Sequence, residues 1–518
     1  MDLRDAEPTV RPNVFSIAKL LDCKNERPKI ACIFLSQFDM KKGNIIIWSK
    51  NIKDTTFNLN NIEFKSLPAG IHEQTDDIVN FVVPKEEGSG NNDTVKKTVY
   101  DYGIAYFKQN SFDIIENDNQ VDRNKVLMFS LGIVIDVQGL PSNSTKHFYK
   151  EIYHAYDANR YASHLKELLS QWMRKNELDN FDLFENFFEK HNKDHIAKNS
   201  IETVENSPKE RRHLIEYMPY WTRNLGPLIF PLWKASLLQK RILILIPQGE
   251  SFEKCNSLAY CIFLISMLSK NLVGNHIDDE YVEPLFTVST SDISFLESLD
   301  EGRGYVATTS EEILLYRPEI YDIAVKLPSS SIMEEFPEKD VEIIAASGEH
   351  NKATPLDLET YEKVILCELE DDVSTNVKNK LHKVTEPISW LQFLIDGFYL
   401  LTTAGYLMAP YHMAKNFRPL KLISSSESND SEIQMAENLI RYFHLRTSNL
   451  YNRLRDIIQK NGNIDSEQPI TIAASFLTEL NLDCFSLQDH QFIKDITYKW
   501  FQRSVDISNL PECVGDLC

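Results

Sequence analysis

The sequence predicts an α/β protein: a small antiparallel sheet with helices, followed by a doubly wound α/β lobe and a C-terminal helical subdomain. Three patterns support this architecture. Runs with a period of two residues fill the segment before residue 138, a continuous apolar run at 241–247 is typical of a parallel strand buried on both faces, and a helical period dominates after residue 381. A chain of 518 residues can bury large cores in two or three such units.

The first lobe is expected to begin at residue 29, after a polar arm. Alternating apolar and polar side chains predict strands over 29–38, 44–49, 99–108 and 126–137. Helical spacing then predicts helices over 148–172 and 181–188, the second with an aromatic face. These aromatic side chains have few basic neighbours, so they indicate a packed core rather than a platform for stacking bases.

Residues 66–83, between the second and third of these strands, are expected to cross the open face of the small sheet. Pro68 and Gly70 indicate a tight turn. Thr75, which two aspartates follow, indicates the start of a short helix. The whole stretch therefore reads as a turn and a helix, not as part of a reaction centre.

The second lobe is predicted around a βαβ unit. Its parts are a strand at 241–247, an apolar helix at 255–272 and a second strand at 281–290. Residues 304–309 and 313–316 predict two further short strands on either side of a turn. This succession is typical of a parallel sheet with covering helices.

The rest of the chain is predicted to be a loop followed by helices. Residues 333–376 are acidic and weakly patterned, which indicates a loop region. Helices are expected over 381–413 and 432–459. Within the first of these, 388–409 is long enough to span a bilayer. Because it contains Gln392, Asp396 and two glycines, a buried helix or helix pair is favoured over a transmembrane helix.

Composition excludes several classes of function. The net charge of −21 leaves no surplus of cations for nucleic acid or for a polybasic membrane patch. The eight cysteines are scattered without a CxxC pair, and the first residues lack the apolar core of a signal peptide, so a reduced, cytoplasmic protein is expected. The absence of a P-loop motif argues against an NTPase of that class.

Motifs for catalysis and cofactor binding are incomplete, so no catalytic, cofactor or metal site is predicted. His72 and Glu73 begin like a zinc-peptidase motif, but Asp76 stands where the second histidine is needed. The glycines near residue 89 lack the third glycine of a dinucleotide fingerprint. Ser251 follows a strand and a turn, as a nucleophile would, but Glu253 replaces the second glycine of that motif, and a helix-capping serine is favoured.

The tail contains two candidate modification sites, Cys513 and Cys518. The C-terminus is not a prenylation box, because Gly515 occupies the required cysteine position. Cys513 and Cys518 on a free tail are compatible with S-acylation, and exposed unmodified thiols are the alternative.

The order of several weak motifs resembles one known family. The chain carries L-P-x-G-I-H at 67–72, then largely apolar segments at 226–244 and 305–315, and P-E-I-Y-D at 318–322. Together these resemble the DENN proteins, in particular the divergent LCHN-type branch found in fungi. The resemblance covers 29–459 and implies a longin-like first lobe.

The resemblance implies a guanine-nucleotide exchange factor for a Rab-type small GTPase in membrane traffic. It also implies a cytoplasmic protein recruited to an organelle or lipid-droplet membrane surface without a transmembrane helix. Such a factor needs no cofactor and offers no catalytic side chain to carry over. A scaffold or Rab-binding adaptor of the same fold without exchange activity, and a hydrolase using Ser251, remain alternatives.

These inferences divide the chain into seven segments. They are a flexible arm (1–28), the longin-like or upstream DENN lobe (29–191), a linker (192–213), the central DENN lobe (214–330), an acidic loop region (331–376), a helical downstream DENN region (377–505) and a tail (506–518).

Overall fold

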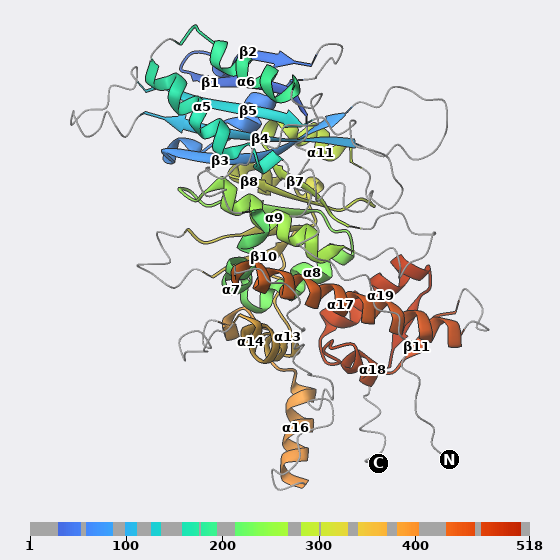
Figure 1. Ribbon diagram of the computed structural model, residues 1–518. Coiled ribbons are helices and arrows are strands. Elements are labelled where there is room, and N and C mark those ends of the chain that lie inside the picture. The colour runs from blue at the N-terminus through green and yellow to red at the C-terminus, as the bar shows by residue number, and fades with distance from the viewer. Residues whose placement is uncertain are drawn as a thin grey trace, which may run out of the picture.

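A computed structural model of the chain shows a mixed α/β protein with one large sheet (Figure 1). It describes residues 29–52, 59–85, 99–110, 126–135, 158–175, 178–193, 213–267, 281–299, 302–329, 340–369, 381–402, 431–461 and 468–508. The predicted arm, the body of the linker at 194–212, the glycines near residue 89, Cys513 and Cys518 all lie outside these residues.

The strands of both predicted lobes form a single ten-stranded sheet, in the order β10-β9-β6-β8-β7-β3-β4-β5-β1-β2. Its members are β1 (Ile30–Asp39), β2 (Gly43–Asn51), β3 (Asp76–Lys85), β4 (Val99–Gln109), β5 (Met128–Ile135), β6 (Ile242–Leu245), β7 (Glu283–Thr287), β8 (Tyr305–Thr309), β9 (Ile323–Lys326) and β10 (Glu342–Ala345). Where the two lobes meet, β3 pairs with β7 through Phe81 and Phe286.

The first five strands are antiparallel and carry helices on both faces. Alternate residues of β1 point to opposite sides: Ile33 and Leu35 pack with α5 (Ala162–Lys175) and α6 (Asp182–Lys193), and Phe34 packs with α2 (Ile62–Ser66). Figure 1 shows α5 and α6 across one face of this half. The four predicted strands and the aromatic core of 181–188 are confirmed.

The stretch at 66–83 corrects two predictions. Gly70 has a φ of 83° in the predicted turn, and a short 3₁₀ helix follows at Ile71–Glu73. The helix expected from Thr75 and the crossing of an open sheet face are both wrong, because β3 begins at Asp76 and lies between β4 and β7. Its apolar run is buried on both faces of the sheet, as a central strand requires.

The second half of the sheet contains the predicted βαβ unit. β6, β8 and β9 run parallel, β7 pairs parallel with β8, and α9 (Phe252–Ser266) connects β6 to β7 across the sheet face (Figure 1). The strand predicted at 313–316 is wrong. A 3₁₀ helix, η8 (Glu312–Tyr316), forms there instead, with Leu314 buried and Ile313 and Tyr316 exposed.

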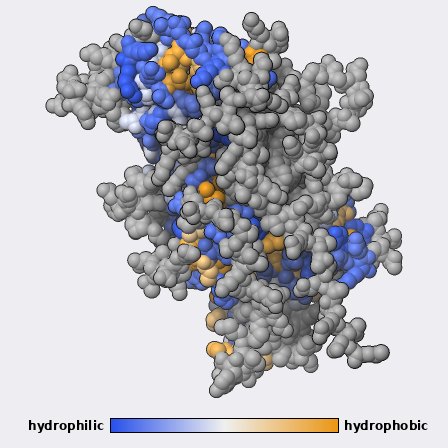
Figure 2. Space-filling model, viewed as in Figure 1, coloured by the Kyte–Doolittle hydropathy of each residue, from blue (hydrophilic) through white to orange (hydrophobic). Residues whose placement is uncertain are grey.

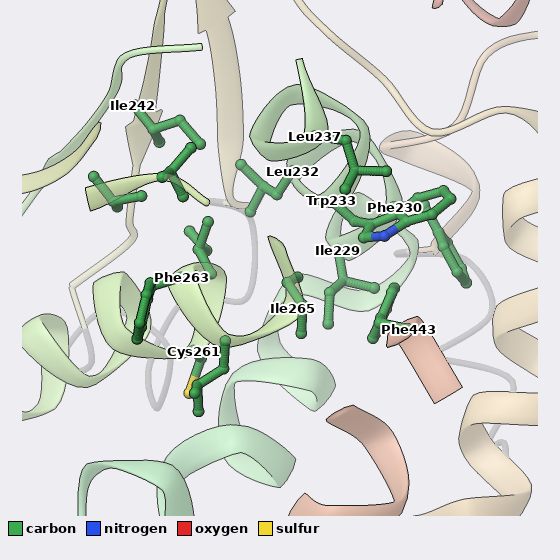
Figure 3. Close-up of a cluster of buried hydrophobic side chains, with 14 of the residues drawn as sticks. Ile229, Phe230, Leu232, Trp233, Leu237, Ile242, Cys261, Phe263, Ile265 and Phe443 are labelled. Carbon is green, nitrogen blue, oxygen red and sulfur yellow. The ribbon is translucent and has the colours of Figure 1, made fainter. Parts of the chain in front are cut away.

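The C-terminal helices share the core of the parallel half. The shared core includes two helices that precede β6, α7 (Met218–Leu225) and α8 (Ile229–Leu237). The C-terminal part contributes α17 (Ser431–Lys460), α18 (Ala474–Glu479), α19 (Leu487–Phe501) and a two-stranded sheet of β11 (Ile470–Ile472) and β12 (Val505–Ile507). Figure 3 shows Phe443 of α17 facing Ile229 and Phe230 of α8. The helix predicted at 432–459 is confirmed, and its apolar stripe is what joins it to α8.

The region expected to be an acidic loop is largely ordered where the structure describes it. It contributes β10, which pairs antiparallel with β9, and a helical segment made of α13 (Pro355–Thr360), a π turn (Tyr361–Ile365) and α14 (Leu366–Glu368). Thr354 accepts a hydrogen bond from Asp357 N and forms a capping box ahead of Pro355. That local signal marks a helix start inside an otherwise acidic stretch.

The apolar segment after residue 381 also differs from its prediction. A helix, α16, covers Trp390–Thr402, and Figure 1 shows it extending from the lower end of the molecule past α13 and α14. The prediction of a buried helix is wrong, because Trp390 is 81% exposed and Leu401 is 83% exposed. Among the helices that the structure describes, none is long and apolar enough to cross a membrane.

Candidate partner-binding cleft at the junction of the sheet halves

The turn at 67–74 is hydrogen-bonded to loops of the parallel half. Gln74 donates a hydrogen bond to the carbonyl oxygen of Gly249, and Gln248 donates one to the carboxylate of Glu73. Ser310, directly after β8, donates to the carbonyl oxygen of Ala69. The L-P-x-G-I-H segment is therefore a contact between the two halves, which its sequence alone did not indicate.

Asp77 makes a buried polar contact at this junction. Its carboxylate accepts hydrogen bonds from Phe252 N at 2.6 Å and from Ser251 Oγ at 3.0 Å, so it caps the N-terminus of α9 from a different part of the chain. Burial raises the pKa of Asp77 to about 6, although the hydrogen bonds from Phe252 and Ile78 oppose that shift. One of the two aspartates that had suggested a local helix start thus caps a distant helix.

Asp77→Asn is expected to remove a pH dependence of stability. With a pKa of about 6 in the folded chain against an ordinary 3.8, the protonated carboxyl favours folding. This contribution is complete below about pH 4 and is lost as the pH rises through about 6. We expect the free energy of unfolding of the wild type, relative to the variant, to fall by up to about 3 kcal/mol across that window. Urea unfolding of both proteins tests this, and a pH-independent difference would contradict it.

Ser251 is the N-cap of α9, which confirms the favoured interpretation. Its Oγ accepts from Lys254 N at 3.3 Å while donating to Asp77. Within the described residues, the contacts of Ser251 are therefore with a carboxylate and the helix backbone rather than with a histidine, which a serine nucleophile needs as its base. Ser251 therefore has a structural role, as the cap of α9.

Two buried contacts between side chains join the halves on the other side of the junction. Lys65 of α2 forms an ion pair with Asp292 at 2.9 Å and donates to the carbonyl oxygen of Val82 at 2.8 Å. Tyr102 of β4 donates to Glu283 of β7 at 2.6 Å. These polar groups are nearly inaccessible to water, so water does not compete for the hydrogen bonds and ion pair that join the sheet halves.

Beside this junction lies a cleft of about 810 Å³. It opens at the carboxyl ends of the parallel strands, where ligands bind in open α/β sheets. Gly70 and Glu73 line it from the antiparallel half, and Gln248 and Ser310 line it from the loops after β6 and β8. Lys326 lines it from the end of β9, and further lining comes from 340–352. The cleft is thus built by both halves.

The lining of the cleft is charged and mixed in sign. Its cationic side chains include Lys326, Lys352 and Lys383, and its acidic ones include Glu312 and Glu342. No group of three or more histidine, cysteine or carboxylate side chains suited to a metal was found among the described residues. His72, which begins the incomplete zinc-peptidase motif, is exposed beside the junction.

An apolar edge adjoins the cleft at η8. Glu312 lines the cleft, and within the same short helix Ile313 is 61% exposed and Tyr316 is 80% exposed. Exposed tyrosines and aliphatic side chains beside a polar rim are typical of binding hot spots. The sequence analysis missed this surface because it assigned the segment to a strand, although the apolar pair between Glu312 and Arg317 was visible.

Comparison with known proteins shows the family to which the chain belongs. The sequence profile of DENN domain-containing protein 11 matches residues 33–337, which include the antiparallel half, β6 to β9 and η8. The chain belongs to this DENN family. The DENN match therefore contains both sides of the junction and ends before β10, so residues 340–352 of the cleft lie outside it.

Relatives of this DENN protein fall into two groups. The uncharacterized protein ANR2 of Saccharomyces cerevisiae is 73% identical over 99% of both chains. DENN domain-containing protein 11 of Rattus norvegicus is 24% identical over 58% of each chain, and uncharacterized protein C119.16c of Schizosaccharomyces pombe is 23% identical. Residues 459–515 match a domain of unknown function. The family prediction is confirmed.

Proposed function

We propose that this chain is a guanine-nucleotide exchange factor for a Rab-type small GTPase in intracellular membrane traffic. In this proposal it works in the cytoplasm, is recruited to a membrane surface, and receives the GTPase at the cleft and its η8 edge. Membership of the DENN family carries the proposal. The cleft supports it, because it is built by both sheet halves and offers charged and apolar surface to a protein partner.

Exchange of this kind requires differential binding rather than a catalytic group. The factor accelerates GDP release if it binds the nucleotide-free GTPase more tightly than the loaded one. A surface of mixed charges beside Ile313 and Tyr316 suits that task, since charged side chains orient the partner and the apolar pair supplies buried contact area. No step in this scheme involves Ser251.

The decisive experiment is the release of fluorescent GDP from a panel of purified Rab proteins with the full chain added. We expect one Rab to release GDP at least about tenfold faster, and Tyr316→Ala to reduce that acceleration by about tenfold, as loss of a hot-spot tyrosine does. Tyr498→Ala is the matched control, because Tyr498 is also exposed but lies on α19, and it should leave the rate unchanged.

Other outcomes would select the alternatives. A Rab that binds the chain through the same surface without faster GDP release would identify an adaptor, which is the second candidate because the same surface serves both roles. Loss of a hydrolytic activity in Ser251→Ala, with folding preserved, would favour the hydrolase. Equal effects of Tyr316→Ala and Tyr498→Ala would contradict the placement of the GTPase at the η8 edge.

A further inference from the structure

The helix α16 turns its polar side toward the protein and its apolar side toward solvent, the reverse of an ordinary surface helix. Its polar side chains Gln392 and Asp396 line a cavity between the helix and the body of the molecule, together with Glu359 and Asp483. Gln392 is only 5% exposed. The large apolar side chains point the other way, into solvent, so the helix presents its hydrophobic face outward.

The apolar face is wide and continuous. At 100° per residue, the exposed large apolar side chains of α16 fall within about half of the helix circumference, and Gln392 and Asp396 fall in the other half. These exposed side chains are Trp390, Leu391, Phe393, Leu394, Phe398, Leu400 and Leu401. Figure 2 shows hydrophobic residues at the lower end of the molecule, where α16 lies. No comparable face exists on the other helices that the structure describes.

The geometry points to a lipid surface rather than a protein groove. A helix bound in a protein groove uses a narrow stripe of anchors at i, i+3, i+4 and i+7, whereas a helix lying in a membrane interface buries its whole apolar face at the boundary between headgroups and acyl chains. The 13 residues of α16 span about 20 Å, too short to cross a hydrocarbon core but suited to lying flat. Trp390 at one end fits the headgroup level, where tryptophan is enriched.

Charge selects the kind of lipid. Residues 384–402 contain no lysine or arginine, Asp396 is the one charged residue of α16, and the chain carries a net charge of −21. Anionic headgroups therefore repel the molecule and offer the helix no ion pair. Binding has to come from apolar burial alone, which favours zwitterionic or neutral lipid with packing defects.

We propose that α16 is a lipid-binding helix that inserts its outward apolar face into the surface of an electrically neutral lipid layer. This assigns the membrane contact to a segment outside the DENN match and away from the cleft. It does not depend on exchange activity, and an adaptor with the same α16 would bind lipid equally well.

Flotation of the full chain with phosphatidylcholine vesicles tests this proposal. We expect the wild type to float, and the double variant Trp390→Gln/Leu401→Gln to lose at least about tenfold in lipid-bound fraction, because two of the most exposed apolar contacts are removed. Replacing part of the phosphatidylcholine with phosphatidylserine should weaken binding. Leu487→Gln is the matched control, since Leu487 is 81% exposed on α19, and it should bind as the wild type does.

Quenching by brominated phosphatidylcholine reports insertion directly. Trp172, Trp221, Trp233 and Trp500 are buried, and Trp48 is half-buried against Phe184 of α6, whereas Trp390 is 81% exposed. Quenching should therefore come mainly from Trp390. Trp390→Phe should keep flotation and lose most of the quenching. The proposal is overturned if the double variant floats like the wild type, if the wild type does not float, or if the double variant instead converts an oligomer to a monomer in light scattering. GDP release measured without vesicles should be unchanged in the double variant, which separates this test from that of exchange.

Discussion

Lys234→Met is expected to lower the free energy of unfolding by about 3–5 kcal/mol, the cost of leaving buried carboxylates without their cation. Lys234 Nζ lies 2.7 Å from Asp357 and 2.6 Å from Asp489, whose side chains are 1% and 0% exposed. Burial acts to lower the pKa of Lys234, but the two carboxylates outweigh it and hold the pKa above the usual value. The lysine is therefore charged in the folded protein.

This buried cluster connects four separate elements. Lys234 belongs to α8, Asp357 to α13 and Asp489 to α19, and Arg446 of α17 lies 3.7 Å from Asp357, so two cations face two anions. Arg446 also lies 4.6 Å above the ring of Phe230. Removing one member leaves the others desolvated and unbalanced, which explains why a single substitution should have so large an effect.

Urea unfolding, followed by circular dichroism and tryptophan fluorescence, measures this effect. Lys494→Met is the control, because Lys494 lies on the same helix as Asp489 but forms an exposed pair with Asp506 at 3.1 Å. That variant should cost less than about 1 kcal/mol. Similar losses in Lys234→Met and Lys494→Met would show that the buried cluster does not stabilise the fold as described.

Lys65→Met is expected to have the second large effect, about 3–5 kcal/mol, by leaving Asp292 buried without its cation. The pair joins α2 of the antiparallel half to the turn after β7, and both side chains are less than a tenth exposed. Because Lys65 also donates to Val82 O in β3, its loss should loosen the junction between the halves. We therefore expect GDP exchange to fall together with stability if the cleft is the partner site.

Hydrogen exchange of the amides in β3 and β7 localises this second effect. They should exchange faster in Lys65→Met, whereas those of α17 should change less. Lys50→Met is the control, since Lys50 pairs with Glu189 at 3.0 Å on the exposed side of β2. A uniform increase in exchange over the whole chain would indicate a general loss of stability instead of a loosened junction.

Elements with a regular local period could be predicted from the sequence. The alternation in β1, β2, β4 and β5, the continuous apolar run of β6 and the stripe of α17 each identify their element within a few residues. Ser251 was also assigned to its capping role, because its position before an apolar helix is a local signal.

Features that depend on distant partners could not be predicted. The apolar run of β3 does not alternate, since it is covered on both faces by segments far away in the chain, and it was mistaken for a crossing segment. Asp77 was assigned to a local helix but caps α9. The outward face of α16 has the composition of a buried helix, and only its surroundings show otherwise.

By itself, then, the sequence determined the alternation of strands and helices, the acidic charge, and the motif order that indicates the DENN family, with the L-P-x-G-I-H turn among its marks. Only the tertiary structure decided that both halves share one sheet and that a cleft lies at the junction of these halves. It also decided that Lys234 forms ion pairs with carboxylates of α13 and α19. The reason is physical: periodicity reports which face of an element avoids water, whereas ion pairs, caps and clefts arise only where elements distant in sequence meet.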